Sequence, residues 1–181
     1  MPHVPDPGGR SSATPLRKTG SQSSPLQKRR RPAHHPPIES GFRSIILFLT
    51  ICTNQRRPVL ATKKTAALIT DAWEAANFWQ VGRYVIMPDH IHLFCAPNTS
   101  PPQPLKKWVA FWRNDVTRKW PIRDQLPIWQ REFWDRQLRQ GESYAAKWEY
   151  VVNNPVRHAL VVRAEDWPFQ GELDVLMWHD R

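Results

Sequence analysis

The spacing of apolar residues changes several times along the chain, and each spacing predicts a different element. A run of β-branched and aromatic residues indicates a strand, whereas apolar residues three or four positions apart indicate a helix packed on one side. In chain order, the pattern predicts a strand at 42–52, a helix at 63–80, strands at 81–87 and 90–96, a helix at 104–120 and a broken strand region at 128–138.

This order of elements predicts an α+β fold, the ferredoxin-like βαββαβ sandwich, in which two helices cover one face of an antiparallel four-stranded sheet. Pro88-Asp89 has the turn chemistry of a tight hairpin. The opposite face of the sheet is expected to stay available for a site. A third helix is predicted at 142–153, where Pro155 stops it, followed by a short turn at 156–160.

The N-terminal segment 1–37 differs from the rest in composition. It is rich in Pro, Ser, Gly and basic residues and has only three sizeable aliphatic residues, so we expect disorder there and a folded domain over 38–181. Its basic run is either a flexible arm that tethers nucleic acid or an extension without a role. The run consists of Lys28, Arg29, Arg30 and Arg31.

The net charge of the chain indicates what kind of molecule it binds. The 181-residue chain has a net charge of +10, of which residues 1–37 supply +6, from seven Lys and Arg against one acid. Such an excess favours an anionic partner, nucleic acid before membrane, although a solubilising surface is the alternative.

Cysteine usage and hydropathy indicate the compartment. Cys52 and Cys95 each lie in an apolar run and are expected to be small buried residues in a reducing compartment. No apolar run approaches the roughly 20 residues that span a bilayer, and the N-terminus lacks the apolar core of a signal peptide. We therefore expect a cytoplasmic protein.

Two histidines separated by one apolar residue form the first candidate site. In a strand, His90 and His92 lie on one face, while Ile91 and Leu93 point into the core. Adjacent imidazoles can hold one metal ion as a bidentate site. Two ordinary strand histidines are the alternative on spacing alone.

The third predicted helix separates two tyrosines. At about 100° per residue, Tyr144 falls in the apolar arc, whereas Tyr150 lies roughly 120° from the centre of that arc. Asn154 lies about 40° from Tyr150 on the same wheel. Tyr144 is thus predicted to be a packing residue and Tyr150 to present its hydroxyl away from the core, unless it is simply a surface tyrosine.

These residues together make a coherent chemical unit. A divalent metal ion on His90 and His92 can polarise an oxygen of a phosphodiester. The Tyr150 phenolate can attack the phosphorus and form a phosphotyrosine. Asn154 can add an oxygen ligand to the metal shell, which two imidazoles leave open.

The chain also resembles a known family. The block Met87-Pro-Asp-His-Ile-His-Leu-Phe94 resembles the His-hydrophobic-His motif of IS200-like, single-tyrosine transposases. The segments Trp129–Arg136 and Glu142–Arg157 are similar to the REP-associated branch, in which a helix carries the catalytic tyrosine just before an Asn-Pro step. The resemblance covers about residues 40–168 and leaves the N-terminal arm unmatched.

The resemblance implies a role for each matching residue. His90 and His92 would be metal ligands, Tyr150 the nucleophile, and Asn154 the third protein ligand, with Mg²⁺ or Mn²⁺ as cofactor. The implied substrate is single-stranded, hairpin-forming DNA, handled by a monomer or a homodimer. Asp89 is expected to shape the turn rather than bind metal, and His158 replaces the small residue usual after the Asn-Pro-Val-Arg step.

The resulting hypothesis is a metal-dependent, single-strand-specific DNA endonuclease and strand transferase. The rival hypotheses are a module that binds single-stranded nucleic acid by stacking, and a replication-initiator or relaxase nuclease, which generally has a third histidine. Arg131 and Arg136 are further candidates for DNA contacts. Five tryptophans fit helix core positions and three are freer to stack on bases. The core set is Trp73, Trp79, Trp108, Trp112 and Trp148; the freer set is Trp129, Trp134 and Trp167.

Overall fold

The computed structural model describes residues 45–138 and 143–177, all of which belong to one compact unit. The N-terminal arm, the predicted boundary at residue 38 and the basic run Lys28–Arg31 lie outside the described residues. The strands are β1 (Leu47–Cys52), β2 (Trp79–Ile86), β3 (His90–Pro97), β4 (Trp134–Gln137) and β5 (Gln170–Glu172); the helices are α1 (Lys63–Ala75), α2 (Leu105–Lys119), α3 (Tyr144–Val152) and α4 (Asn154–Arg157). Single 3₁₀ turns occur at Asn54–Arg56, Arg123–Gln125 and Ala164–Asp166.

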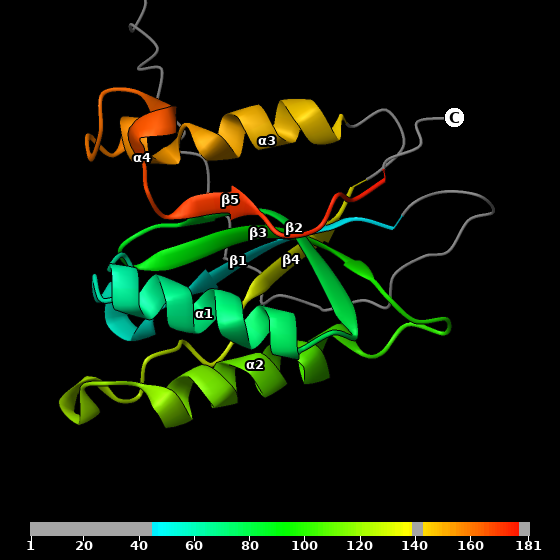
Figure 1. Ribbon diagram of the computed structural model, residues 1–181, viewed down its shortest axis with the longest axis horizontal. Coiled ribbons are helices and arrows are strands. Elements are labelled where there is room, and N and C mark those ends of the chain that lie inside the picture. The colour runs from blue at the N-terminus through cyan, green and yellow to red at the C-terminus, as the bar shows by residue number, and fades with distance from the viewer. Residues whose placement is uncertain (1–44, 139–142, 178–181) are drawn as a thin grey trace, which may run out of the picture. The chain divides into compact units, whose positions relative to one another are not determined.

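The strands form one five-stranded antiparallel sheet in the order β4-β1-β3-β2-β5 (Figure 1). Its first four strands have the order that a βαββαβ chain gives, so the predicted α+β ferredoxin-like fold is confirmed. The fifth strand was not predicted, because its sequence Gln-Gly-Glu has no apolar alternation.

Helices α1 and α2 cover one face of the sheet, and α3 lies on the opposite side (Figure 1). The larger core lies on the α1–α2 face, where Ile91 and Leu93 are fully buried, as the strand pattern predicted. Several tryptophans interlock edge to face in this core, which favours specific packing as well as burial. They are Trp73, Trp108, Trp112 and Trp129.

The second face of the sheet is less open than expected. Val85 and Phe94 point to this side and need cover, which α3 and the C-terminal segment provide. Trp167 packs there and donates its indole N–H to the Ile86 carbonyl at 3.1 Å. A second, smaller core therefore leaves only part of this face for a site. Its buried members are Ile46, Val85, Met87, Phe94, Leu138, Tyr144, Val151, Trp167 and Leu176.

The first predicted helix ends earlier than the apolar spacing indicated. Helix α1 begins with a capping box between Thr62 and Thr65 and ends at Ala75. Trp79, assigned to this helix by spacing, instead opens β2 opposite Pro97. Its ring is buried beside that of Trp108, so its apolar spacing reflected burial in the same core and not helical periodicity.

Two later elements also differ from their predicted bounds. In the 128–138 region only Trp134–Gln137 forms a strand, and Trp129 makes an isolated bridge to Thr53, so the predicted break is confirmed. Helix α3 begins after Ser143, whose hydroxyl accepts from the Ala146 N–H, and Glu142 lies outside the described residues. Pro155 lies in the first turn of α4, where its missing N–H costs nothing, so the predicted turn at 156–160 begins as the last part of this short helix and continues as a turn at 158–159.

The two cysteines differ in environment. Cys95 is buried, and burial raises the pKa of its thiol well above the usual value. Cys52 is only half-buried, contrary to expectation, and its sulfur accepts a bond from the Arg56 guanidinium at 2.8 Å. Over the described ranges 45–138 and 143–177, the helices are too short or too polar to cross a membrane.

Adjacent aromatic residues on α2 test this packing. Trp112 is fully buried, whereas Phe111 is exposed. Trp112→Ala should lower the free energy of unfolding by about 3–5 kcal/mol, because it leaves a cavity against the sheet. Phe111→Ala should change it by less than about 0.5 kcal/mol. Urea unfolding followed by circular dichroism measures both, and equal losses would contradict the assigned core.

Candidate functional site

The two histidines lie side by side at the start of β3, on the face of the sheet that carries α3. The β1–β3 register places Cys52 opposite His90 and Thr50 opposite His92. The Nε2 atoms of His90 and His92 face each other at 3.1 Å, and the two rings are nearly perpendicular. Strand alternation thus brings both imidazoles to one point, as predicted.

The outer ring nitrogens of both histidines are held by neighbours. His90 Nδ1 lies 2.7 Å from the Asp89 carboxylate, and His92 Nδ1 lies 3.0 Å from the Thr50 hydroxyl. Because a carboxylate only accepts, His90 carries its proton on Nδ1 and presents a lone pair at Nε2. Metal-binding histidines are commonly oriented by such an outer carboxylate or hydroxyl.

Asp89 does more than shape the turn. It lies in the turn between β2 and β3, as expected, and its backbone carbonyl accepts from the Thr53 N–H and hydroxyl, which ties the turn to the end of β1. Its side chain also bridges His90 and the Arg56 Nε, at 2.7 Å on each side. Arg56 reaches this position with a left-handed φ of 56°, a costly conformation for a residue other than glycine.

Sequence reasoning missed Arg56 and Thr50. A carboxylate directly before His90 was a visible signal for an outer-shell partner. Thr50 and Arg56, by contrast, reach the histidines only through strand pairing and a strained turn, for which the sequence gives no local signal.

Both imidazoles are held in the neutral form. Burial lowers the pKa of His90, although Asp89 partly opposes this effect. The pKa of His92 falls to about 3, mainly through burial and then through repulsion from His90 and from nearby cations. Neutral imidazoles are the form that binds metal ions.

The two tyrosines of α3 lie as the helical wheel predicted. Tyr144 is 8% exposed, and its hydroxyl accepts from the Arg83 N–H at 3.3 Å. Tyr150 is 61% exposed. The Arg157 guanidinium lies over the Tyr150 ring, 4.0 Å from its centroid, and donates to the Tyr150 carbonyl at 2.8 Å. Arg157 therefore fixes the backbone and restricts the ring of this exposed residue.

Asn154 is buried at the break between α3 and α4. Its amide nitrogen donates to the Val151 carbonyl at 3.0 Å, and its Oδ1 accepts from Arg157 at 2.6 Å. One guanidinium thus joins Asn154 to Tyr150. The role of Asn154 as a metal ligand stays a prediction, since the bond from Arg157 already occupies one of its oxygen lone pairs.

Aromatic and cationic side chains connect α3 and α4 to the histidines. The Phe48 ring stacks on that of His92 with 5.4 Å between centroids. The Lys147 Nζ lies 5.0 Å from the Phe48 ring and 5.5 Å from the Tyr150 ring. The His158 ring lies 6.3 Å from that of His90.

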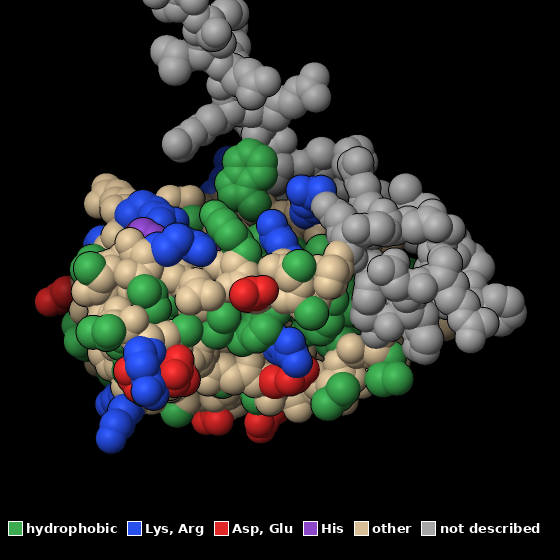
Figure 2. Space-filling view, turned by 90° about the horizontal axis from the view of Figure 1, so that it is seen from above, with side chains coloured by type: hydrophobic (Ala, Val, Ile, Leu, Met, Phe, Trp, Pro, Cys, Tyr) green, Lys and Arg blue, Asp and Glu red, His purple; other side chains and the backbone are tan. Residues whose placement is uncertain are grey.

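This arrangement surrounds the histidine pair with positive charge. Arg56, Lys147 and Arg157 all lie close enough to lower the pKa of His92 by repulsion. Figure 2, a view onto the α3 side, shows Lys and Arg side chains beside a histidine at upper left. Positive charge at this position favours an anion such as a phosphodiester.

The residues predicted to contact nucleic acid differ in their exposure to solvent. The Arg131 side chain is almost fully exposed and lies 3.8 Å from Glu132, while Arg136 is exposed on β4. Trp129 and Trp167 are only 8% exposed, so their prediction as free stacking residues was wrong: each fills a core. Trp134 is 49% exposed, as predicted.

A metal ion bound by His90 and His92 would need further ligands that are not histidine, cysteine or carboxylate side chains. Within residues 45–138 and 143–177, no group of three or more His, Cys, Asp and Glu side chains could hold a metal ion. The histidine pair therefore offers two nitrogen ligands, and water, substrate or an amide would complete the shell.

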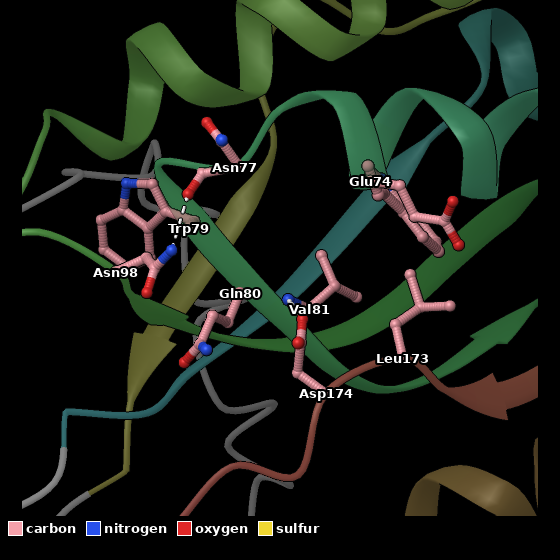
Figure 3. A pocket seen from close by; sticks show the side chains of 9 residues that line it. Glu74, Asn77, Trp79, Gln80, Val81, Asn98, Leu173 and Asp174 are labelled. Atoms are coloured by element: carbon pink, nitrogen blue, oxygen red, sulfur yellow. Dashed lines mark hydrogen bonds between the residues drawn. The ribbon is translucent and has the colours of Figure 1, made fainter.

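A hollow of about 260 Å³ lies elsewhere, at the first residues of β2 (Figure 3). Trp79 pairs with Pro97, so this end of the sheet is distant along β3 from His90. Two of its polar side chains are bonded within the fold: Asn98 donates to the Asn77 carbonyl, and the Asp174 carboxylate accepts from the Val81 N–H. The hollow is separate from the histidine site.

Comparison with known proteins bears on the resemblance seen in the sequence. A protein of Haemophilus influenzae, assigned provisionally to the REP-associated tyrosine transposases, is 30% identical over 98 residues, which cover 48% of this chain and 54% of that protein. The REP-associated tyrosine transposase of Escherichia coli is 25% identical over 91 residues, covering 50% and 53%. The resemblance to REP-associated tyrosine transposases is confirmed. The chain thus spans about half the length of these curated relatives.

The fold agrees with the same family. A solved structure of a REP-associated tyrosine transposase bound to a REP hairpin superposes with a TM-score of 0.58 at 21% identity, covering 74% of this chain and 79% of that one. At this identity the match shows a shared fold. No family model matches the chain.

The pKa of His92 predicts an acid-dependent loss of stability. Between about pH 6.5 and 3, the unfolded chain binds a proton at His92 that the folded chain excludes, so the free energy of unfolding falls as the pH falls. Each excluded proton contributes a slope of about 1.4 kcal/mol per pH unit. His92→Gln should reduce the slope by about this amount in urea titrations between about pH 5.5 and 4 with EDTA. Equal slopes would contradict a neutral His92.

Proposed function

We propose that this protein is a metal-dependent endonuclease and strand transferase that acts on single-stranded, hairpin-forming DNA through a phosphotyrosine at Tyr150. The observation that carries the proposal is the pair of Nε2 atoms of His90 and His92, aimed at one point and 3.1 Å apart. Cations surround this pair, and an exposed tyrosine lies on the helix above it.

The donor set fits a divalent ion. Two nitrogens bound at about 2.1 Å in neighbouring octahedral positions lie roughly 3 Å apart, close to the observed separation. Asp89 and Thr50 keep both rings oriented, and burial keeps both neutral. Of the expected ions Mg²⁺ and Mn²⁺, imidazole ligands favour Mn²⁺. Such an ion supplies Lewis-acid polarisation of a phosphate oxygen when bound.

The remaining chemistry belongs to the side chains. Arg56, Lys147 and Arg157 carry the positive charge that attracts the phosphodiester. The Tyr150 oxygen, having lost its proton to solvent, forms a bond to phosphorus while the bond from phosphorus to the 3′-oxygen breaks. The 3′-oxygen takes up a proton, and the 5′-phosphate stays on Tyr150. Attack by a 3′-hydroxyl on this phosphotyrosine reverses the step and joins strands.

The proposed substrate rests on the net charge of the chain and on a structurally similar transposase. The net charge of +10 favours a nucleic acid, and the structurally similar transposase was solved with a REP hairpin. We expect the protein to work in the cytoplasm, as a monomer or a homodimer. The basic run Lys28–Arg31 and Arg131 are proposed to add phosphate contacts.

A non-catalytic module for single-stranded nucleic acid is the second candidate. The exposed Trp134 and the cations of the α3 side favour binding by stacking and charge. The paired Nε2 atoms favour the enzyme, because stacking needs no such pair. Covalent trapping distinguishes the two candidates.

Tyr150→Phe tests the nucleophile. It removes one exposed hydroxyl, so stability should change by less than about 0.5 kcal/mol. Adducts with a labelled single-stranded hairpin oligonucleotide in Mn²⁺, seen by denaturing gel, should disappear, because phenylalanine offers no nucleophile. Hairpin binding should persist.

Tyr144→Phe is the matched control on the same helix. Its adducts should persist, while loss of the hydroxyl that accepts from Arg83 should cost about 1 kcal/mol of stability. Adducts that persist in Tyr150→Phe and vanish in Tyr144→Phe would overturn the assignment. A wild-type protein that binds the hairpin but never forms an adduct would favour the binding module.

Asp89→Asn tests the orientation of His90. Loss of the carboxylate partner should weaken Mn²⁺ binding roughly 10- to 100-fold in isothermal titration, as is typical of outer-shell changes. Asp124→Asn, at an exposed carboxylate in the 123–125 turn, should have no effect. His90→Ala should abolish binding, and Mn²⁺ affinity that survives in His90→Ala would contradict the metal site.

A further inference from the structure

An exposed tryptophan lies in the same row of the sheet as the histidine pair. On β4, Trp134 pairs with Thr50 of β1, which pairs in turn with His92 of β3. Directly paired residues share a face, so Trp134, Thr50 and His92 lie on one face across three strands. At about 4.8 Å per strand, the Trp134 backbone lies roughly 10 Å from that of His92.

Other side chains anchor β4 to the two cores. The neighbouring Phe133 anchors β4 to the larger core, and Leu138, on the same face as Trp134, anchors its far end to the smaller core. Trp134 is nonetheless 49% exposed on a strand that ends the sheet. Edge strands usually carry charge rather than exposed aromatic residues, because a bare apolar edge invites aggregation.

The surroundings of Trp134 are cationic. Arg136 lies two residues along β4 on the same face, opposite Phe48. The Lys147 ammonium lies over the ring of that same Phe48. Cationic side chains therefore lie beside the row of residues that runs from Trp134 to the histidine pair. Their charge suits a polyanion better than an apolar protein segment or a second copy of this basic chain.

We propose that Trp134 is a stacking platform for an unpaired nucleobase of single-stranded DNA, next to the phosphate held at the histidine pair. This subsite rests on the proposed function and adds where the strand runs: from His92 across β1 to the β4 edge. An indole can stack on any base, so the contact would add affinity for unpaired DNA with little sequence preference. Duplex DNA keeps its bases stacked on one another and could not use it.

Binding measurements on two oligonucleotides test the subsite. One is a hairpin with an unpaired extension, and the other is the same stem closed without an extension. Trp134→Ala should weaken binding of the extended hairpin roughly 10- to 100-fold in fluorescence anisotropy, because one base–aromatic stack is lost. Trp134→Phe should restore most of the affinity, and the blunt hairpin should bind all variants equally.

Phe111→Ala is the matched control, since Phe111 is similarly exposed, at 55%, but lies on α2, on the other side of the sheet. It should leave both affinities unchanged. A 2-aminopurine in the extension should be quenched on binding to the wild type and less so on binding to Trp134→Ala. Circular dichroism should show all variants folded.

Three outcomes would overturn the subsite. These are equal affinity of wild type and Trp134→Ala for the extended hairpin, equal loss for both oligonucleotides, or a changed oligomeric state in light scattering without a change in DNA affinity. Failure of the cleavage proposal looks different: the wild type would form no adduct, while the loss on Trp134→Ala would still be confined to the extended hairpin.

Discussion

The pairing of β1 with β3 is the constraint on which the site depends. It places Cys52 opposite His90 and Thr50 opposite His92, and so brings the Arg56 turn and the Thr50 hydroxyl to the two imidazoles. A slip of one residue would turn every side chain of one strand to the other face. The buried Ile91 and Leu93 prevent that slip, because it would expose them to solvent. The larger core therefore fixes the geometry of the site on the opposite face.

The two faces of the sheet differ in how completely they are covered. On the α1–α2 side, interlocked tryptophans pack among many aliphatic side chains in the larger core. On the α3 side, a smaller core covers only part of the sheet and leaves room for polar and cationic groups near the histidines. Partial cover explains how His92 can be buried enough to stay neutral and still lie within electrostatic reach of the exposed Arg157.

The break between α3 and α4 determines which side chains contact the exposed Tyr150. Pro155 begins a new helical turn after Asn153, which brings Arg157 back over α3. That guanidinium contacts the Tyr150 ring and carbonyl and the Asn154 amide. A straight continuation of α3 would place Arg157 seven residues along the helix, about two turns or roughly 10 Å from Tyr150.

Local sequence patterns determined the features that depend on a regular spacing of side chains. The βαββαβ order and the shared face of His90 and His92 followed from helix and strand periodicity. The contrast between Tyr144 and Tyr150 followed from a helical wheel. Tertiary structure decided what has no local pattern. The short β5, the burial of Trp129 and Trp167, and the place of Trp79 in a strand depend on partners far along the chain. So do the contacts of Thr50 and Arg56 with the histidines, because strand register and a left-handed turn bring them there. A sequence shows which side chains share a face, whereas only the packed sheet shows which faces meet.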